Sequence, residues 1–275
     1  MATDIAGSET TGAALAPAPP APADEPRPRM YPRRFAVVYG LLGLVVAGAV
    51  AGLVFAITSS GVVGGGPAWS SWKPSGGGLG AAKQIADQVG KSYRLSNGDQ
   101  LVDVIAKPPS VSPSSSQTIP IHYVAVRGTG GKGDQIVSVS SSNSMMYQLC
   151  GLGSSCAIAS GKPTVARGTL VRREILELAL YTFKYVGGVN SVIALMPPPA
   201  GTQPQYVIYL QKSDVSAELK EPLDKTLGVK VPLPAKIPAR EVHVVDSVTE
   251  SRVYKFGFSQ AQTGDAILVL TPLPA

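Results

Sequence analysis

The sequence predicts an α+β protein in which a single transmembrane helix precedes an extracytoplasmic domain of mainly antiparallel sheet with helices on one face. A long run without charge lies near the N-terminus and has the length of a membrane span. Beyond it, helical patterns alternate with pairs of β-branched segments in the order helix–strand–strand. Strands joined in pairs favour antiparallel sheet with helices gathered on one side.

The uncharged run extends from Phe35 to Ile57. At about 1.5 Å of rise per residue it forms a helix of roughly 34 Å, enough to cross a hydrocarbon core of about 30 Å. Four arginines precede it directly, at Arg27, Arg29, Arg33 and Arg34. The first cation after it is Lys73. Because positively charged flanks stay in the cytoplasm, we expect a single-pass protein of the cell membrane with a cytoplasmic N-terminus and an extracytoplasmic C-terminal domain.

This reading divides the chain into four parts. Residues 1–34 form a disordered, Ala/Pro-rich cytoplasmic tail, and residues 35–58 the transmembrane helix. Residues 59–80 form a flexible Gly/Ser-rich juxtamembrane linker, and residues 81–275 the extracytoplasmic domain. The main alternative is a cleaved secretory signal ending at 54–56, but signal peptides have shorter apolar segments that begin nearer the N-terminus. We therefore favour an uncleaved anchor.

The membrane helix carries one further pattern, since Gly48 and Gly52 form a Gly-x-x-x-Gly pair. Small residues at this spacing let two helices approach closely. Self-association into a homo-oligomer, or docking to another membrane protein, is the expected use of this face. Glycine is also common in membrane spans that make no such contact.

In the first half of the domain, a short helix is expected at 79–89, where Ala82, Ile85 and Val89 share a face. Three segments rich in β-branched residues predict strands at 101–106, 119–127 and 135–140. Residues 109–117 are expected to form a Ser/Pro loop. Residues 128–134 are expected to form a hairpin loop, because Lys132 is not followed by the Ser or Thr and the helix that a phosphate loop requires.

The strongest helical pattern covers 169–186, with Thr169 as N-cap and two glycines after its end. Its apolar face is wide and leaves only a narrow polar stripe, made of Arg173, Glu177 and Lys184. Such a helix is expected to be the central packing element. A further helix should begin at Asp214 and be broken at Pro222. The remaining β-branched segments predict strands at 191–196, 206–211, 241–245, 252–258 and 266–270.

The only cysteines, Cys150 and Cys156, both follow the predicted membrane span. An even count in an oxidising compartment favours a disulfide, and two intervening glycines help a small ring to close. Loop-closure arguments give about 2–3 kcal/mol of stabilisation for such a ring. Redox catalysis is not indicated, because the Cys-x-x-Cys spacing is absent.

Metal and nucleophile motifs are not found, so we expect no metal and no cofactor. His122 and His243 are both expected in strands, without partners at a metal-ligand spacing. Residues 70–73 match Ser-x-x-Lys, but they fall in the predicted linker and lack the companion motifs of penicillin-binding enzymes.

Two pairs of carboxylates could serve a glycosidase. They are Glu174 with Glu177 and Asp99 with Asp103. The helical pair lies next to Arg172, so its members are more simply read as surface charges. No catalytic residues can be named, and the sequence leans against an enzyme.

The formal net charge is +6, and the part after residue 60 accounts for all of it, with 20 Lys and Arg against 14 Asp and Glu. A basic domain beside a membrane suits anionic lipid heads or acidic wall polymers, although a merely solvated surface is the simpler explanation of this modest, dispersed charge. Given the compartment, we expect no nucleic acid partner. Trp69 and Trp72 are expected at the membrane interface, or alternatively as a stacking platform for a sugar or peptide.

The Ala-, Gly- and Pro-rich composition with a basic, Pro-rich tail is similar to that of envelope proteins of high-GC bacteria. Our hypothesis is a membrane-anchored, non-enzymatic envelope protein whose basic domain binds a partner protein or a cell-wall polymer. The alternative is an anchored wall-modifying enzyme whose catalytic residues are dispersed in the sequence. A signalling accessory is a third reading, which the plain tail disfavours.

Overall fold

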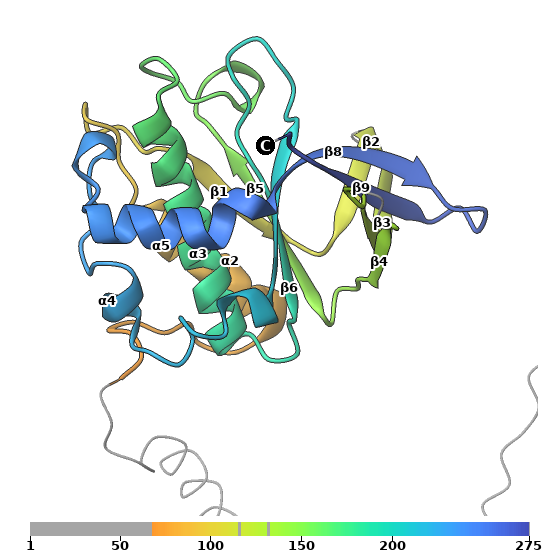
Figure 1. The fold of residues 1–275 in the computed structure, drawn as a ribbon, viewed down its shortest axis with the longest axis horizontal. Helices are drawn as coiled ribbons and strands as arrows, with labels where there is room; N and C mark the ends of the chain where they lie inside the picture. The colour runs from red at the N-terminus through yellow and green to blue at the C-terminus, as the bar shows by residue number, and fades with distance from the viewer. Residues whose placement is uncertain (1–67, 115–116, 131–132, 275) are drawn as a thin grey trace, which may run out of the picture. The chain divides into compact units, whose positions relative to one another are not determined.

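The computed structural model describes residues 68–114, 117–130 and 133–274. Three predicted segments lie outside these ranges: the tail, the membrane span with Gly48 and Gly52, and the linker up to residue 67. Within the described ranges, no helix is both long and apolar enough to cross a membrane. Residues from 68 onward form a mixed α+β unit (Figure 1).

The α-helices of this unit are α2 (Gly78–Gly90), α3 (Val165–Tyr185), α4 (Leu223–Thr226) and α5 (Ala239–Thr249). The strands are β1 (Asp103–Lys107), β2 (Ser110–Ser114), β3 (Gln117–Val126), β4 (Gln135–Ser138), β5 (Ser144–Cys150), β6 (Ser191–Leu195), β7 (Tyr206–Gln211), β8 (Val253–Gln260) and β9 (Ala266–Pro272). They pair in the order β1-β5-β6-β7-β8-β9-β3-β2, with β4 also beside β3. The β5–β6 and β3–β9 pairs are parallel and the others antiparallel, so the mixed α+β prediction is confirmed.

The sheet curls until its two halves pack on each other, which makes it nearly a closed barrel. Side chains from β5, β6 and β7, such as Met146 and Ile193, share a buried cluster with Val124 of β3 and Leu268 of β9. Alternate residues of the same strands, such as Tyr147, point the other way and pack under α2, α3 and α5. Strands β5 to β7 are therefore buried on both faces, whereas β2, β3, β4, β8 and β9 lie away from the helices (Figure 1).

Helix α3 connects the parallel strands β5 and β6 and is the central packing element that the sequence predicted. It begins earlier than expected, because Thr164 rather than Thr169 is the N-cap: the Thr164 hydroxyl accepts a hydrogen bond from the Arg167 backbone N–H at 3.2 Å. The hydroxyls of Thr182 and Tyr147, 2.7 Å apart, join the helix to β5.

Several segments differ from the sequence expectations. The helix expected from Asp214 is only a short 3-10 turn, Lys212–Val215, followed by α4 after Pro222. Strand β5 was not predicted, because its Met-Met-Tyr run lacks alternation. The expected loop at 109–117 contains β2, a strand at the end of the sheet order that pairs with β3. The expected strand at 241–245 is part of α5, where buried Glu241, Val245 and Val248 recur at helical spacing.

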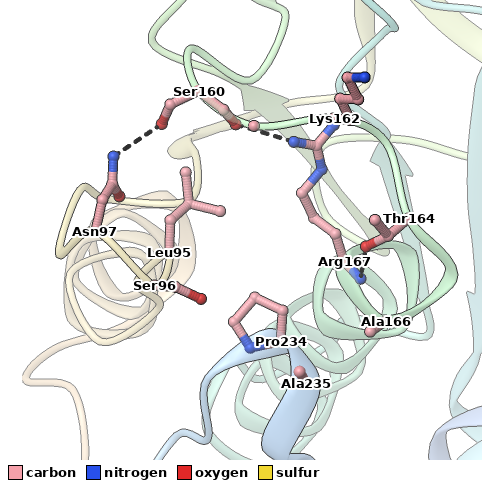
Figure 2. Close-up of a pocket in the computed structure, with 11 residues that line it drawn as sticks. Leu95, Ser96, Asn97, Ser160, Lys162, Thr164, Ala166, Arg167, Pro234 and Ala235 are labelled. Atoms are coloured by element: carbon pink, nitrogen blue, oxygen red, sulfur yellow. Dashed lines mark hydrogen bonds between the residues drawn. The ribbon is translucent and has the colours of Figure 1, made fainter.

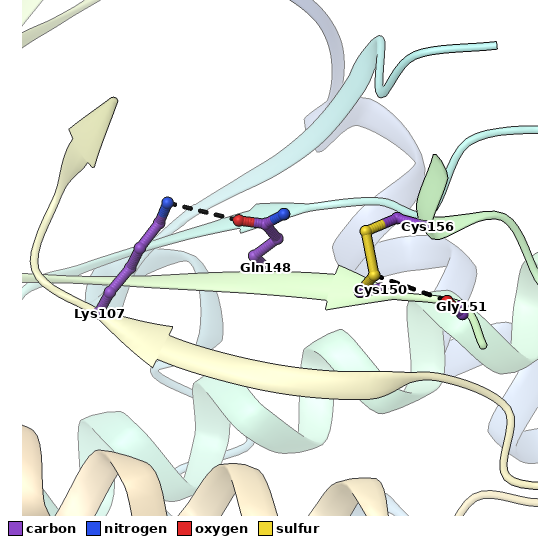
Figure 3. Close-up of a disulfide and its surroundings, with 5 residues drawn as sticks. All are labelled: Lys107, Gln148, Cys150, Gly151 and Cys156. Carbon is purple, nitrogen blue, oxygen red and sulfur yellow. Dashed lines mark hydrogen bonds between the residues drawn. A yellow bond between two sulfur atoms is a disulfide. The ribbon is translucent and has the colours of Figure 1, made fainter. Parts of the chain in front are cut away.

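The Cys150–Cys156 disulfide is present, as predicted, at the end of β5 (Figure 3). The two Cα atoms are 4.3 Å apart, and the Gly151 backbone N–H donates to the Cys156 carbonyl at 2.8 Å. A Cβ at Gly151 would lie 2.2 Å from the Ala157 backbone, so this position requires glycine. The bridge thereby fixes where the chain leaves β5 for the loop that leads into α3.

Candidate functional site

The segment from residue 68 to 74 packs on the outer side of α3, although it falls in the predicted linker. Trp69 and Trp72 make edge-to-face contacts with Tyr181, with ring centroids 5.6 and 5.5 Å apart. The Ser70 hydroxyl is 2.7 Å from that of Tyr185. The tryptophans thus have a packing role within the fold, which neither sequence interpretation had included.

This segment forms one wall of a cavity of about 550 Å³, here called the acidic cavity. Its lining combines aromatic and aliphatic side chains with two carboxylates and one ammonium group. The lining residues are Ala68, Trp69, Ser70, Ser71, Glu177, Tyr181, Pro222, Leu223, Asp224, Lys225, Leu227, Gly228 and Val229. Only Glu177 among the charged members belongs to a long helix; Asp224 and Lys225 are exposed on α4.

Behind Glu177 lies a buried cluster of charged groups centred on Arg173, whose side chain is 0% exposed. The guanidinium donates to Tyr93 Oη at 2.6 Å and Glu177 Oε2 at 3.2 Å. It also donates to Glu241 Oε2 at 2.6 Å and to the Gly228 carbonyl at 3.0 Å. Arg173 and Glu177 of the expected polar stripe are therefore paired, and the expectation that Glu174 and Glu177 are surface charges is wrong, because the first is buried and the second largely so.

Arg173 is buried because two distant segments cover it, whereas Lys184 farther along the helix is exposed. The 222–238 segment brings Gly228 over α3, and α5 brings Glu241. Glu241 Oε1 accepts the Gly228 backbone N–H at 3.0 Å, and a Cβ at Gly228 would lie 2.5 Å from that same oxygen. A side chain at position 228 would displace the Glu241 carboxylate from the ion cluster, so glycine suits the crossing of the loop, which forms the floor of the acidic cavity.

Burial changes the titration of these groups. It raises the pKa of Glu177, although Arg173 and the Tyr93 hydroxyl oppose the shift. For Arg173, burial alone would lower the pKa, but the surrounding oxygens of Tyr93, Glu177 and Glu241 outweigh it, so the guanidinium stays charged. Burial followed by repulsion from Glu177 raises the pKa of Glu174 well above its ordinary value. Both Glu174 oxygens are buried without a hydrogen-bond partner, which favours the neutral acid.

A second cavity, of about 350 Å³, lies at the start of α3 and is here called the basic pocket (Figure 2). It is lined by Leu95, Ser96, Asn97, Ser160, Gly161, Lys162, Thr164, Ala166, Arg167, Pro234 and Ala235. The lining holds two cations, several hydroxyl and amide groups, and no carboxylate. Arg167 Nη1 donates to the Ser160 carbonyl at 3.0 Å, which holds the guanidinium at the pocket wall, and burial lowers its pKa.

The loop beside this pocket is held by side chains from two parts of the chain. Asn97 Nδ2 donates to Ser160 Oγ at 3.1 Å and to Asp99 Oδ2 at 2.6 Å. Gly161 adopts a left-handed φ of +75°, so the loop turns directly before Lys162. The sequence analysis did not single out Lys162 or Arg167. The pattern that could have pointed to this pocket is Lys162 placed two residues before Thr164, the N-cap of α3.

The residues examined for catalysis are not brought together. His122 on β3 pairs with Asp265 at 3.1 Å on the surface, and His243 is exposed on α5 rather than in a strand. Ser70 Oγ donates to the Trp72 carbonyl at 2.5 Å instead of contacting Lys73. In the residues that the structure covers, no group of three or more His, Cys, Asp or Glu could hold a metal ion.

Glu177 is therefore the one candidate among the predicted carboxylate pairs that reaches a cavity. Its neighbour Glu174 is buried, and Asp99 and Asp103 are exposed and line none of the cavities described. Comparison of the chain with models of protein families, with curated proteins and with solved structures found no match.

Proposed function

We propose that this chain is an envelope protein anchored in the membrane by residues 35–58, whose C-terminal domain binds an anionic polymer of the cell wall. The observation that carries the polymer proposal is the basic pocket. Its lining has two cations and no carboxylate, in a domain that also carries the whole positive excess of the chain. The membrane anchor rests on the charge-free run and its arginine flank.

The donors of the basic pocket suit a phosphate or carboxylate group. Lys162 provides a compact ammonium group and Arg167 a planar guanidinium. The first turn of α3 adds the positive end of a 21-residue helix without an acidic side chain in that turn. A volume of about 350 Å³ accommodates one repeat of a polymer, with neighbouring repeats running over the surface. Such binding weakens as salt rises, because exposed cations are screened.

The test is co-sedimentation of the full-length chain, in a non-ionic detergent, with cell walls from which protein has been removed. We expect binding that falls between 50 and 500 mM salt, roughly following the Debye length. Lys162→Gln should weaken it by about threefold to tenfold, the effect of one well-placed charge. Lys255→Gln is the matched control, since Lys255 is also exposed but lies on β8.

Equal losses in the two variants would show that general surface charge, not the pocket, attracts the wall. Walls stripped of their anionic polymer form the second arm. Undiminished binding to stripped walls would contradict the proposal.

A wall-modifying enzyme is the less supported alternative. Of the groups that commonly move protons, His122 and His243 line neither cavity. Glu177 reaches the acidic cavity, but its Oε2 is already engaged by Tyr93 and Arg173. These two hydrogen bonds hold the Glu177 carboxylate in place, which favours a role in ligand binding over a role in proton transfer.

A further inference from the structure

We propose that the acidic cavity is a second ligand site, which binds a primary ammonium group through Glu177 and the rings of Trp69 and Tyr181. This site is separate from the basic pocket and takes the opposite charge. The ligand class is an amine-bearing molecule, such as a peptide with a free α-amino group or a lysine side chain.

The Glu177 carboxylate is positioned to accept one more hydrogen bond. Tyr93 Oη donates to its Oε2 at 2.6 Å and Arg173 Nη1 donates to the same oxygen at 3.2 Å. Within the described part of the chain, the hydrogen bonds to this carboxylate end on Oε2, and Oε1 is not among the buried polar atoms that lack a partner. The side chain is 15% exposed and lines the cavity. Oε1 is thus an accessible acceptor, and its position is fixed because Tyr93 and Arg173 hold Oε2 of the same carboxylate.

Two aromatic rings stand beside this acceptor in the cavity lining. Trp69 and Tyr181 meet edge to face, with their planes at 88°. Ring faces attract ammonium groups, and Trp attracts them most strongly. The chain itself provides an example, because Lys184 Nζ lies 5.4 Å from the Trp69 ring centroid without belonging to the lining.

The lining of the cavity is one cation short. It carries two carboxylates, Glu177 and Asp224, and one ammonium group, Lys225. Behind the lining Arg173 faces Glu241, and Lys184 lies against the Trp69 ring. A bound ammonium group would restore the balance, whereas a neutral sugar would leave it unchanged. A ligand cation is therefore the chemistry that this lining favours.

The test is titration calorimetry of the full-length chain in non-ionic detergent with Nα-acetyl-lysine methylamide, whose single charge is a primary ammonium group. The Nε-acetylated form, which is neutral, is the reference probe. Glycinamide tests an α-amino source of the same group. Trp69 and Trp72 are the only tryptophans of the chain, so a change in intrinsic fluorescence reports binding beside α3.

We expect saturable binding of the ammonium probe and at least about tenfold weaker binding of the neutral form, the effect of one charge-assisted hydrogen bond. Glu177→Gln should weaken binding similarly. Because that change touches the ion cluster, Asp224→Asn on the exposed helix α4 provides a second variant, expected to lose about threefold. Glu221→Gln is the control, since Glu221 is exposed nearby but does not line the cavity.

Equal affinity for the charged and neutral probes would overturn the proposal, as would a disaccharide binding more tightly than either. The same holds if Asp224→Asn and Glu221→Gln weaken binding by equal factors. Loss of wall binding in the co-sedimentation assay has no bearing here, because that assay reads the basic pocket.

Discussion

The acidic cavity and the basic pocket lie beside the same helix but are built in different ways. The acidic cavity has a floor of buried charged and polar groups, to which the loop after α2, α3, the 222–238 loop and α5 each contribute one. The basic pocket is formed by exposed loops and the first turn of α3, and its principal cation, Lys162, is on the surface. The comparison teaches that the charged groups under the acidic cavity contribute to the stability of the fold. The cations of the basic pocket, in contrast, can be changed with little effect on stability.

The largest effect is expected from Arg173→Met, which removes the centre of the ion cluster. Glu177 and Glu241 would then be buried without their partner, so the free energy of unfolding should fall by about 3–5 kcal/mol. Denaturant unfolding measures this loss. Lys162→Met in the basic pocket should change stability by no more than about 0.5 kcal/mol. Similar values for the two variants would break the comparison.

The next effect is expected from replacing both cysteines, Cys150→Ser with Cys156→Ser. Loss of this small ring should cost about 2–3 kcal/mol. The ring also fixes the start of the loop that carries Ser160 and Lys162, so affinity for wall polymer should fall together with stability. The acidic cavity lies outside this loop, and its ammonium affinity should be unchanged in the folded variant. A loss at the acidic cavity but not at the basic pocket would contradict this assignment.

Glu174→Gln tests how burial affects a titrating group beside the ion cluster. The folded chain holds a proton on Glu174 above the ordinary pKa of 4.5, where the unfolded chain releases it. The folded state therefore loses stability as pH rises from about 4.5 through the raised pKa of Glu174. Glutamine cannot ionise, so the variant should be more stable than the parent by about 1–2 kcal/mol at neutral pH, with little difference at pH 4.

Thermal unfolding from pH 4 to 8 measures this difference. A benefit that is equal at every pH would show that shape, not ionisation, is responsible. Glu218→Gln at a partly exposed site serves as the control for a general change in net charge.

The smallest effect is expected from Thr164→Ala, at the start of α3. Its hydroxyl caps the Arg167 backbone N–H, so its loss should cost about 1 kcal/mol. Thr164→Ser retains the cap and should cost much less. Wall binding should weaken in the alanine variant only in proportion to the fraying of the first turn of α3. Amide hydrogen exchange measures this fraying. Full protection of the Arg167 amide in the alanine variant would contradict the cap.

The sequence predicted those elements whose local pattern is unambiguous. Helix α3 and strands β6 and β7 have strong periodicity and clear breakers at their ends, and all were placed within a few residues. Helix α5 was missed because Val242, Val244 and Val245 have high β propensity, which packing of the helix against α3 overrides.

Neither cavity could be read from the sequence, for different reasons. The partners of Arg173 come from Tyr93, Gly228 and Glu241, and no local pattern reveals that these meet. The basic pocket joins residues near 97, 162 and 234, so charge counting detected an excess of cations but not the place where two of them converge. The disulfide was predictable, because a chain with two cysteines allows one pairing only.

The parallel pairing of β3 with β9 has a consequence for the order of folding. It sets Ile121 beside Ala266, and β9 is the last element of the chain, yet it lies inside the sheet between β3 and β8. Closing so long a loop is slow compared with joining β5, α3, β6 and β7, which follow one another between residues 144 and 211. Until the C-terminal residues arrive, β3 and β8 each keep an unpaired edge that can recruit a strand from another molecule. Protection of this half during synthesis is thus a requirement that the topology itself imposes.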